Sequence, residues 1–495
     1  MKNLLIASLA LALSTGVALA QELPQKDSKW FTDAQAKIQE MVARQPITKR
    51  AKNVILFTAD GNGVGTNYAV RLFSGQQAGL LGSEYVQPQE TFPNLALVKT
   101  YTTNGQTPDS APTASAMNTG VKSKNTMINV DETIAVNDCA NMAGHELKTF
   151  AELASEAGKS VGVISTARLT HATPAGVYAK TVNRNWEDNT GLPEDCTNQT
   201  DIASQLINQM KAGVIDIAMG GGRRHFIPTD FTDGEGKTGK RTDGHNLVEE
   251  AQAAGVQFAW GDEDFAKLKL DGSPVLGLFE SSHMKYEYDR AGEPSLAEMT
   301  EATIKALQNN ENGYYISIEA GRVDHANHDG NLHRVLTDGK AFADAIALAD
   351  ELTDDEDTLI IVTADHEHAI AFNGYCGRGS PITGLCYDID DAGVKHTNEP
   401  KKGKDGKAYT VAGYLNGAGS VLKEDQQWTG SRPELTNEQA MDPDYLQQAL
   451  IPMSSETHSG EDVAVMAKGP WAHLFDGVIE QNYIFHVMNY AVNAK

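Results

Sequence analysis

The segment DTLIIVTADH (residues 357–366) decides how this chain of 495 residues folds. Its unbroken run of Leu, Ile and Val is typical of a strand that is buried on both faces, as the strands of parallel sheets are. Asp365 and His366 end this run, so the strand leads into two side chains that can bind a metal ion. Four more segments have the same apolar, β-rich character: NVILFTAD (53–60), SVGVIST (160–166), IDIAMGGG (215–222) and GYYISIEAG (313–321).

Helix-like stretches alternate with these strands at residues 146–159, 295–310 and 336–352. The alternation predicts an α/β fold with three layers (α/β/α), in which a central, largely parallel β-sheet lies between helices. Residues 374–455 differ, since they contain KKGKDGK, NGAGS and few apolar runs. We interpret them as a long inserted excursion, made of loops, a cap or an oligomer contact, within a single domain that spans residues 21–495.

The first twenty residues, MKNLLIASLALALSTGVALA, predict a secretory signal peptide. Lys2 forms a short positive region, Leu4 to Leu13 the apolar region, and Ala18-Leu19-Ala20 a small-x-small cleavage site. An uncleaved membrane anchor is the alternative, although the apolar run is short for a membrane span. No later segment is long and apolar enough to cross a bilayer, and the end, FHVMNYAVNAK, lacks the tail of a GPI signal. We therefore expect an exported protein, periplasmic or extracellular, without a membrane anchor in its mature form.

Charge and cysteine content fit this expectation. The formal net charge of −25 argues against a nucleic-acid partner, because a polyanion would be repelled. Export makes the four cysteines candidates for disulfides. Cys376 and Cys386 enclose GRGSPITGL, whose Gly and Pro residues suit a loop closed by a disulfide, which leaves Cys139 and Cys196 for each other. Four cysteines allow three pairings, and the other two stay open at this point.

Acidic residues recur where the predicted strands end. Asp60 follows the first strand, Glu319 and then Asp324 follow another, and Asp365 follows a third. In open α/β sheets, ligands bind in the crevice beyond the carboxyl ends of the strands. One such acid alone would more often be a turn former or a helix cap. Three strand ends with the same pattern predict a site, and cations are the reason to gather acids that would otherwise repel.

The segment EAGRVDHANHDG (319–330) gives this site its chemistry. Asp324 and His328 are four residues apart, so on a helix they face the same way as a pair of metal ligands. A mixture of imidazole and carboxylate ligands suits Zn²⁺. A further histidine is needed, and His458 in SSETHSGEDVAV is the candidate, although a lone histidine in a loop is usually only solvated.

Eight motifs together resemble the ordered signatures of the alkaline phosphatase family, and they span about Lys52 to Ala491. They are KNVILFTADGNG, TPDSAPTASAMNTG, THATPAGVYAKTVNRNW, IAMGGGRRHF, LGLFESSHMKYEYDR, IEAGRVDHANHDG, TLIIVTADHEHA and ETHSGEDV. The resemblance implies hydrolysis of phosphate monoesters through a phosphoserine, two zinc ions and one magnesium ion, a crown-like excursion near residues 374–455, and usually a homodimer. The family's glycine before the first aspartate is Ala59 here, a change that leaves ligation undisturbed.

The resemblance also implies which residues bind each ion. The first zinc would be held by Asp324, His328 and His458. The second zinc would be held by Asp60, Asp365, His366 and the Ser110 oxygen. The magnesium would be held by Asp60, Glu319 and Thr173, which are hard oxygen donors, with waters completing an octahedron. His171 and His325 stand where some bacterial members have Asp and Lys, so the chain is similar to the animal and marine bacterial type; both would reach phosphate or ligands through water.

Ser110 in TPDSAPTASA (107–116) is the implied nucleophile, and no G-x-S-x-G surrounds it, which excludes a serine hydrolase of that kind. Two zinc ions can stabilise both the attacking and the leaving oxygen of an in-line displacement. Arg184 in TVNRNWED is the expected phosphoryl clamp, since a guanidinium binds two oxygens at once. Ser110 is expected to start a helix whose amides favour phosphate. Asp109 is expected to support Arg184, with capping of that helix as the rival role.

This set of residues grips the phosphoryl group and offers no pocket for the leaving group, so we expect a broad range of phosphate monoesters and an alkaline optimum. A phosphodiesterase or sulfatase of the same superfamily is the nearest alternative, but DSAPTA lacks the C-x-P-x-R or S-x-P-x-R pattern of sulfatases. A non-catalytic phosphate- or metal-binding protein is disfavoured because the nucleophile and every ligand are present. Residues 279–290 resemble a calcium-binding region of some relatives, with too few acids to predict a site.

Overall fold

A computed structural model describes residues 23–393, 396–420, 423–424, 427–428 and 431–494. The predicted signal peptide, residues 1–20, lies outside the described residues. The chain divides into two units, one ending at Pro46 and one spanning Ile47–Lys495. In the first unit, helix α1 (Lys29–Ala43) buries none of its side chains.

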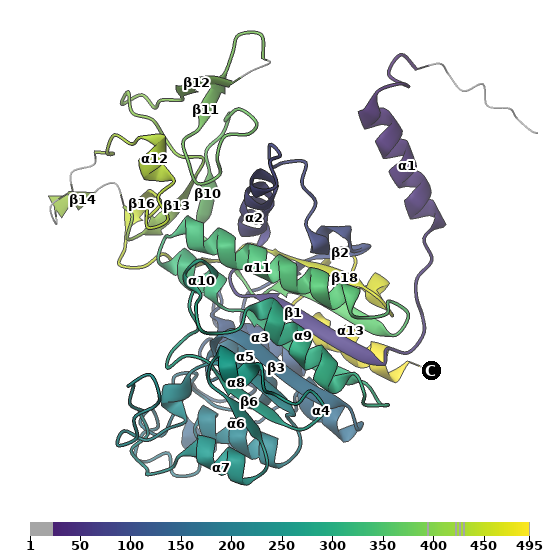
Figure 1. Cartoon of the computed structure of the whole chain (residues 1–495), viewed down its shortest axis with the longest axis vertical. Coiled ribbons are helices and arrows are strands. Elements are labelled where there is room, and N and C mark those ends of the chain that lie inside the picture. Colours follow the sequence, from purple (N-terminus) through teal and green to yellow (C-terminus); the bar gives the residue numbers. More distant parts are fainter. Residues whose placement is uncertain (1–22, 394–395, 421–422, 425–426, 429–430, 495) are drawn as a thin grey trace, which may run out of the picture. The chain divides into compact units, whose positions relative to one another are not determined.

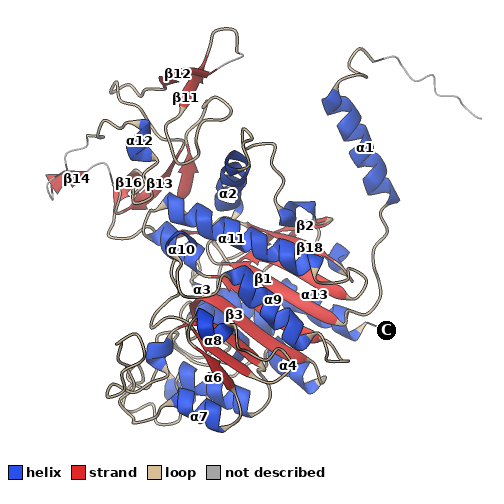
Figure 2. Ribbon diagram, in the orientation of Figure 1, coloured by secondary structure: helices blue, strands red, loops and turns tan. Residues whose placement is uncertain are grey.

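A ten-stranded sheet forms the centre of the second unit (Figure 2). Its strands are parallel except for β18, which pairs antiparallel with β8 and β2. The order across the sheet is β19 (Val478–Glu480), β2 (Asn94–Lys99), β18 (Val463–Lys468), β8 (Thr358–Ala364), β1 (Asn53–Ala59), β7 (Tyr314–Ala320), β3 (Ser160–Arg168), β4 (Ile217–Gly221), β6 (Val275–Leu278) and β5 (Gln257–Ala259).

Alternate residues of the central strands enter two separate hydrophobic cores. Along β1, Val54 and Leu56 belong to one core, and Ile55 and Phe57 to the other. The first core is covered by α3 (Ser110–Thr119), α4 (Phe150–Glu156), α5 (Ala172–Tyr178), α6 (Ile202–Lys211), α7 (Leu247–Ala253) and α13 (Tyr483–Asn493). The second is covered by α2 (Val64–Gln77), α9 (Leu296–Leu307), α10 (Arg322–His328) and α11 (Leu332–Glu351), and the short α8 (Asp262–Phe265) adjoins β5. The predicted three-layer α/β/α fold with a largely parallel sheet is confirmed.

Capping residues explain where the helices begin. Helix α4 starts at Phe150 because Thr149 and Glu152 form a capping box. Helix α9 starts after Ser295 for the same reason, with Glu298 as its partner. Helix α11 begins four residues earlier than the sequence pattern predicts, since the side chain of Asn331 caps it.

The predicted excursion forms small sheets, one of which lies beside α2 and α10 (Figure 1). One sheet joins β10 (Ile370–Phe372), β13 (Ala412–Gly417) and β16 (Ala449–Pro452). Two hairpin-like pairs are β11 (Tyr387–Ile389) with β12 (His396–Pro400) and β14 (Lys423–Glu424) with β15 (Gln427–Trp428), and α12 (Asn437–Ala440) lies among them. Both expected disulfides, Cys376–Cys386 and Cys139–Cys196, are present.

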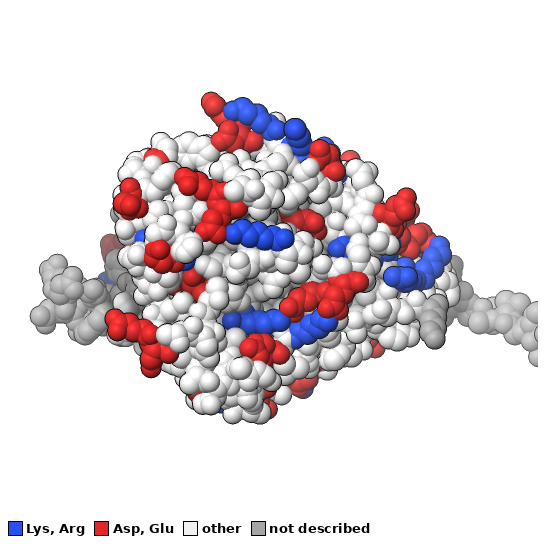
Figure 3. Space-filling view, turned by 90° about the horizontal axis from the view of Figure 1, so that it is seen from below, with Lys and Arg blue, Asp and Glu red and all other residues white. Residues whose placement is uncertain are grey.

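No helix among the described residues is long and apolar enough to cross a bilayer. On the face drawn in Figure 3, Lys and Arg side chains are separated by acidic and uncharged residues and form no continuous basic tract.

Candidate metal centre

Three neighbouring strands end at one level and bring their following residues together. Ala59, the last residue of β1, lies opposite Ala320 of β7 and Ala364 of β8. Asp60 and Asp365 follow directly, and both are completely buried. The predicted gathering of acids at the carboxyl edge of the sheet is confirmed.

Helix α3 delivers Ser110 to this edge as its first residue. The Ser110 side chain is buried, and its Oγ lies 3.4 Å from Asp60 Oδ1 and 3.4 Å from His366 Nε2. Every residue of α3 is buried, which its small side chains allow without pushing the serine away from the sheet. The groups beside the hydroxyl therefore come from strands far away in the sequence, as expected.

Asp60, Asp365 and His366 converge into the first of three ligand groups. His366 Nε2 lies 3.2 Å from Asp60 Oδ1 and 3.4 Å from Asp365 Oδ2. Thr113 donates a hydrogen bond to Asp365 Oδ2 at 3.1 Å, which holds that carboxylate from the side of α3. With the Ser110 oxygen, the group offers three oxygens and one nitrogen, a donor set that Zn²⁺ accepts.

Asp324, His328 and His458 form the second group, together with His368. Asp324 and His328 lie one turn apart on α10, as predicted, with His328 Nε2 3.3 Å from Asp324 Oδ1. His458 comes from β17 (His458–Ser459), and its Nε2 lies 3.2 Å from the same oxygen.

Backbone carbonyls fix which nitrogen each of these rings offers. His328 Nδ1 donates to Glu456 O at 2.6 Å, and His458 Nδ1 donates to Pro108 O at 2.8 Å. Because a carbonyl can only accept, each Nδ1 carries a proton, so in the neutral ring the lone pair lies on Nε2. Both lone pairs point toward Asp324, which is the arrangement that a metal ion requires.

His368 was missed in the sequence, although it stands two residues after His366 in ADHEHA. It lies on β9 (Glu367–His368), which pairs with β17 so that His368 is opposite His458. Its Nε2 is 2.9 Å from Asp324 Oδ1 and its Nδ1 is 2.5 Å from Glu456 Oε2. Burial alone would lower the pKa of His368, but these two carboxylates raise it to about 10.

The third group joins Asp60, Glu319 and His171, with Thr173 of α5 beside them. Four of their buried polar atoms have no hydrogen-bond partner: Asp60 Oδ2, Glu319 Oε1, His171 Nδ1 and Thr173 Oγ1. Leaving buried polar atoms unpaired costs about 1–3 kcal/mol each, so this cluster fits a bound cation. Its oxygens suit Mg²⁺, and His171 adds a nitrogen that the sequence placed only within reach through water.

Electrostatics support cations at this edge. Burial, followed by the charge of Asp60, raises the pKa of Asp365 to about 7. Burial likewise raises the pKa of Glu319 to about 7, with Asp365 and Asp324 adding to the effect. A cation among these carboxyl groups would favour their ionised forms and displace the protons.

Arg184, the phosphoryl clamp predicted from the sequence, contacts Asp109 and His171. Its Nη1 is 3.3 Å from Asp109 Oδ1, and its Nη2 is 3.1 Å from His171 Nε2. Asp109 also caps α3, because its Oδ1 accepts from Ala111 N at 2.8 Å. The two rival roles of Asp109 are therefore both present, and the cap ties the guanidinium to the start of the nucleophile helix.

Three imidazoles pack together in tilted and edge-on contacts, and one of them, His171, contacts Arg184. The ring of His325 lies 5.4 Å from that of His171 and 4.0 Å from that of His283. Burial lowers the pKa of His325 to about 3 and holds that of His283 far below its usual value, so both rings stay neutral. His283 follows β6 in a loop without a recognisable ligand spacing, and sequence reasoning missed it.

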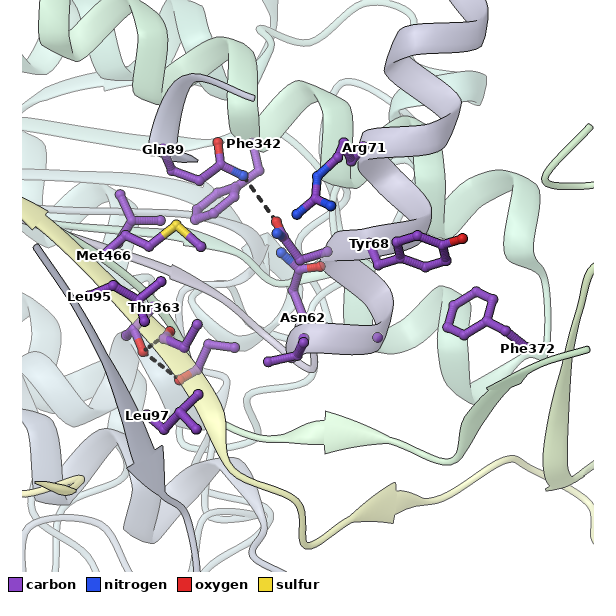
Figure 4. Close-up of a pocket in the computed structure, with 17 residues that line it drawn as sticks. Asn62, Tyr68, Arg71, Gln89, Leu95, Leu97, Phe342, Thr363, Phe372 and Met466 are labelled. Carbon is purple, nitrogen blue, oxygen red and sulfur yellow. Dashed lines mark hydrogen bonds between the residues drawn. The ribbon is translucent and has the colours of Figure 1, made fainter. Parts of the chain in front are cut away.

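A groove of about 540 Å³ lies beside the metal groups and is mostly apolar (Figure 4). Tyr68 and Arg71 of α2, Leu95 of β2 and Met466 of β18 line it, with Phe372 at one end. None of the candidate metal ligands lines this groove.

Comparison with known proteins gives consistent matches. A family model described as Alkaline phosphatase matches residues 51–494. An alkaline phosphatase of Gadus morhua is 39% identical over 485 residues, covering 94% of this chain and 97% of that protein. The tissue-nonspecific alkaline phosphatase isozyme of Gallus gallus is 37% identical, covering 99% of this chain and 94% of that protein.

Solved structures show the same fold. The alkaline phosphatase of the Antarctic bacterium TAB5 has a TM-score of 0.61 at 21% identity, covering 90% of this chain and 100% of that one. The alkaline phosphatase of Thermus thermophilus has a TM-score of 0.63 at 21% identity, covering 92% and 94%.

Proposed function

The chain belongs to the alkaline phosphatase family, whose members hydrolyse phosphate monoesters, and we propose that it does so through a phosphoserine on Ser110. The observation that carries this proposal is the position of the Ser110 hydroxyl, 3.4 Å from both His366 and Asp60, the carboxylate that two of the three candidate ligand groups share. No side chain with the geometry of an ordinary general base is needed at such a centre.

We propose two zinc ions and one magnesium ion as its cofactors. Asp324, His328 and His458 would hold one zinc. Asp60, Asp365, His366 and the Ser110 oxygen would hold the other. Asp60, Glu319 and Thr173 would hold magnesium, with His171 beside it. Bound there, the zinc ions would supply the positive charge that favours a serine alkoxide and a departing alkoxide.

The protein's own residues position the phosphoryl group. Ser110 Oγ forms the bond to phosphorus as the ester oxygen leaves, and water later breaks the phosphoserine. Arg184 contacts Asp109 through Nη1 at 3.3 Å and His171 through Nη2 at 3.1 Å, which leaves one N–H of each terminal nitrogen for two phosphoryl oxygens. The first amides of α3 add to the attraction of the anion. His325 stays neutral and would reach the phosphate through water.

Activity of the metal-loaded protein toward a chromogenic phosphate monoester at alkaline pH tests this function. We expect Ser110→Ala, or chelation of the wild type, to reduce turnover to background, and zinc plus magnesium to restore the chelated wild type. Ser115→Ala is the matched control, since Ser115 is buried in the same helix but donates to Ala111 O. Turnover that survives both treatments would overturn the proposal. The broad substrate range is tested by comparing aryl and alkyl monoesters of different sizes.

We also propose a homodimer whose contact includes the apolar groove and the neighbouring excursion. Val64, Tyr68 and Leu95 are 51%, 37% and 54% exposed, although all three line the groove. Tyr68 meets Phe372, at the foot of the excursion, with ring centroids 5.0 Å apart, so the two surfaces are continuous. Light scattering should give twice the chain mass, and Leu95→Glu should give the monomer; a wild-type monomer would contradict the proposal.

Export to the periplasm or the exterior is proposed on the predicted signal peptide and the two disulfides. Fractionation of expressing cells, with the N-terminus of the recovered protein sequenced, should give a chain that begins after Ala20.

A further inference from the structure

A buried carboxylate, Glu456, connects the histidine-rich ligand group and has no role in the reaction described so far. Its side chain is completely buried, and it lies two residues before His458. Glu456 N donates to His328 O at 2.9 Å, and His328 Nδ1 donates to Glu456 O at 2.6 Å. The main chain of Glu456 thus fixes the ring of one ligand whatever its side chain is.

The side chain of Glu456 acts on a different ligand. Its Oε1 accepts from Ala369 N at 2.6 Å and its Oε2 lies 2.5 Å from His368 Nδ1. The other nitrogen of that ring, Nε2, lies 2.9 Å from Asp324 Oδ1. The imidazole of His368 therefore contacts both carboxylates, so the position of the Glu456 carboxylate affects the position of the Asp324 carboxylate.

The surrounding backbone leaves room for this chain of contacts. A Cβ atom at Gly61 would lie 2.3 Å from His368 Nε2, and one at Gly417 would lie 3.2 Å from Glu456 Cβ. Both glycines have positive φ, +66° and +139°, which other residues rarely adopt. Gly61 and Gly417 thus allow two separate loops to pack closely against His368 and Glu456.

We propose that Glu456 is a positioning residue for the zinc ion bound by Asp324, His328 and His458. Through His368, its carboxylate fixes the position of Asp324 Oδ1, the same oxygen that lies 3.3 Å from His328 Nε2 and 3.2 Å from His458 Nε2. The inference rests on the proposed function, since it assumes zinc in this group. Partners that orient metal ligands in this way typically change metal affinity by about 10- to 100-fold when they are removed.

We would measure zinc affinity by competition with a chromogenic chelator. This measurement shows whether the Glu456 carboxylate positions Asp324 or whether its side chain only fills space. Glu456→Met keeps the volume and removes both hydrogen bonds, and we expect it to weaken zinc binding about 10- to 100-fold. Glu456→Gln can still accept from Ala369 N and donate to His368 Nδ1, whose Nε2–H then still reaches Asp324. It should recover most of the loss.

A second measurement compares melting temperatures with and without zinc. The gain in melting temperature on adding zinc should shrink in Glu456→Met, whereas a purely structural defect would lower both states equally. Asp201→Asn is the matched control. Asp201 is a buried carboxylate that is paired with Arg241 and contacts no candidate ligand. The zinc affinity of this variant should therefore stay within twofold of that of the wild type.

The outcomes are distinct. A wild type that binds no zinc would overturn the proposed function. Wild-type zinc binding with Glu456→Met within twofold of it, or with Glu456→Gln as weak as Glu456→Met, would overturn the positioning role alone. Should Glu456→Met fail to fold, His368→Phe removes the contact to Asp324 with Glu456 in place, and the same 10- to 100-fold loss is expected.

Discussion

Of two sets of buried acids with raised pKa values, one lies in the candidate metal centre and the other does not. In the crevice, burial raises the pKa of both Asp365 and Glu319 to about 7. Under the segment that follows β6, Glu293 and Asp338 line a small cavity. Burial raises the pKa of Glu293 to about 7 and that of Asp338 to about 8.

The neighbours of the two sets differ. Asp365 and Glu319 lie among imidazoles whose nitrogens converge with carboxylate oxygens. Glu293 instead accepts from Lys285 N at 2.7 Å, and Asp338 accepts from Glu287 N at 3.0 Å. In the described part of the chain, all groups of three or more converging ligand atoms lie in the crevice. A raised pKa therefore does not identify a metal site; the set of donors around the acid does.

Removal of bound cations should affect the crevice acids and leave the second set unaffected, and this is the largest difference that we expect between the two sets. We expect the stripped protein to lose activity to background, because the crevice acids then retain protons and Ser110 loses its activating charge. The pKa of Asp365 and Glu319 in the folded protein, about 7, exceeds the ordinary values of 3.8 and 4.5. Between about pH 4 and pH 7 the stripped native state thus holds protons that the unfolded chain releases, and its stability falls as pH rises.

Thermal unfolding of stripped and loaded protein at several pH values measures this effect. The loaded protein should lack the part of the fall that comes from Asp365 and Glu319, since bound cations keep these two carboxyl groups ionised. Equal pH profiles for the two forms would mean that these acids are not the ones that bind the cations.

Arg184→Ala tests whether the guanidinium group binds the phosphoryl group in the crevice. The guanidinium is expected to bind transferring phosphoryl oxygens, and loss of one such stabilising group typically costs about 10²- to 10³-fold in kcat. Arg184→Lys should recover only part, because an ammonium cannot bind two oxygens in a plane. The matched control is Arg290→Ala beside the second set of acids, since Arg290 pairs with Glu287 at 2.9 and 3.1 Å. Its activity should remain within twofold of wild type.

The same substitution in both sets, Asp365→Asn and Asp338→Asn, sharpens the comparison further. Asp365→Asn replaces a ligand oxygen and should weaken zinc binding by more than about tenfold. Asp338→Asn should leave zinc content and activity unchanged. Zinc content measured after dialysis against a weak chelator distinguishes them, and a loss of zinc in Asp338→Asn would erase the difference between the two sets.

Much of this centre could be predicted from local sequence. The buried strands are unbroken apolar runs, and the acids that follow them, such as Asp60 and Asp365, must meet because parallel strands end at one edge. Asp324 and His328 follow from helical spacing. The sequence resemblance then assigned the partners of Ser110, which no local pattern gives.

The residues of the candidate site that could not be identified from the sequence are placed there by tertiary contacts. His368 orients Asp324 only because β9 pairs with β17, and Glu456 reaches His368 only because its loop returns to His328. His283 packs against His325 from a loop that β3 and β4 hold by backbone hydrogen bonds, such as Met284 N to Thr166 O. No spacing within a single segment reports such contacts.

Asp338→Asn should also change how stability depends on pH. Burial raises the pKa of Asp338 to about 8 from an ordinary value of 3.8. Between about pH 4 and pH 8 the native state keeps a proton that the unfolded chain has lost, so wild-type stability falls as pH rises, by at most about 1.4 kcal/mol per pH unit from this group. An asparagine cannot ionise and can still accept from Glu287 N, so the variant should lack this part of the slope and be the more stable protein above pH 8.

Denaturant unfolding of metal-loaded protein at pH 6 and pH 9 measures the difference. Parallel slopes in the two proteins would show that Asp338 is ionised in the native state across this pH range and would contradict the prediction.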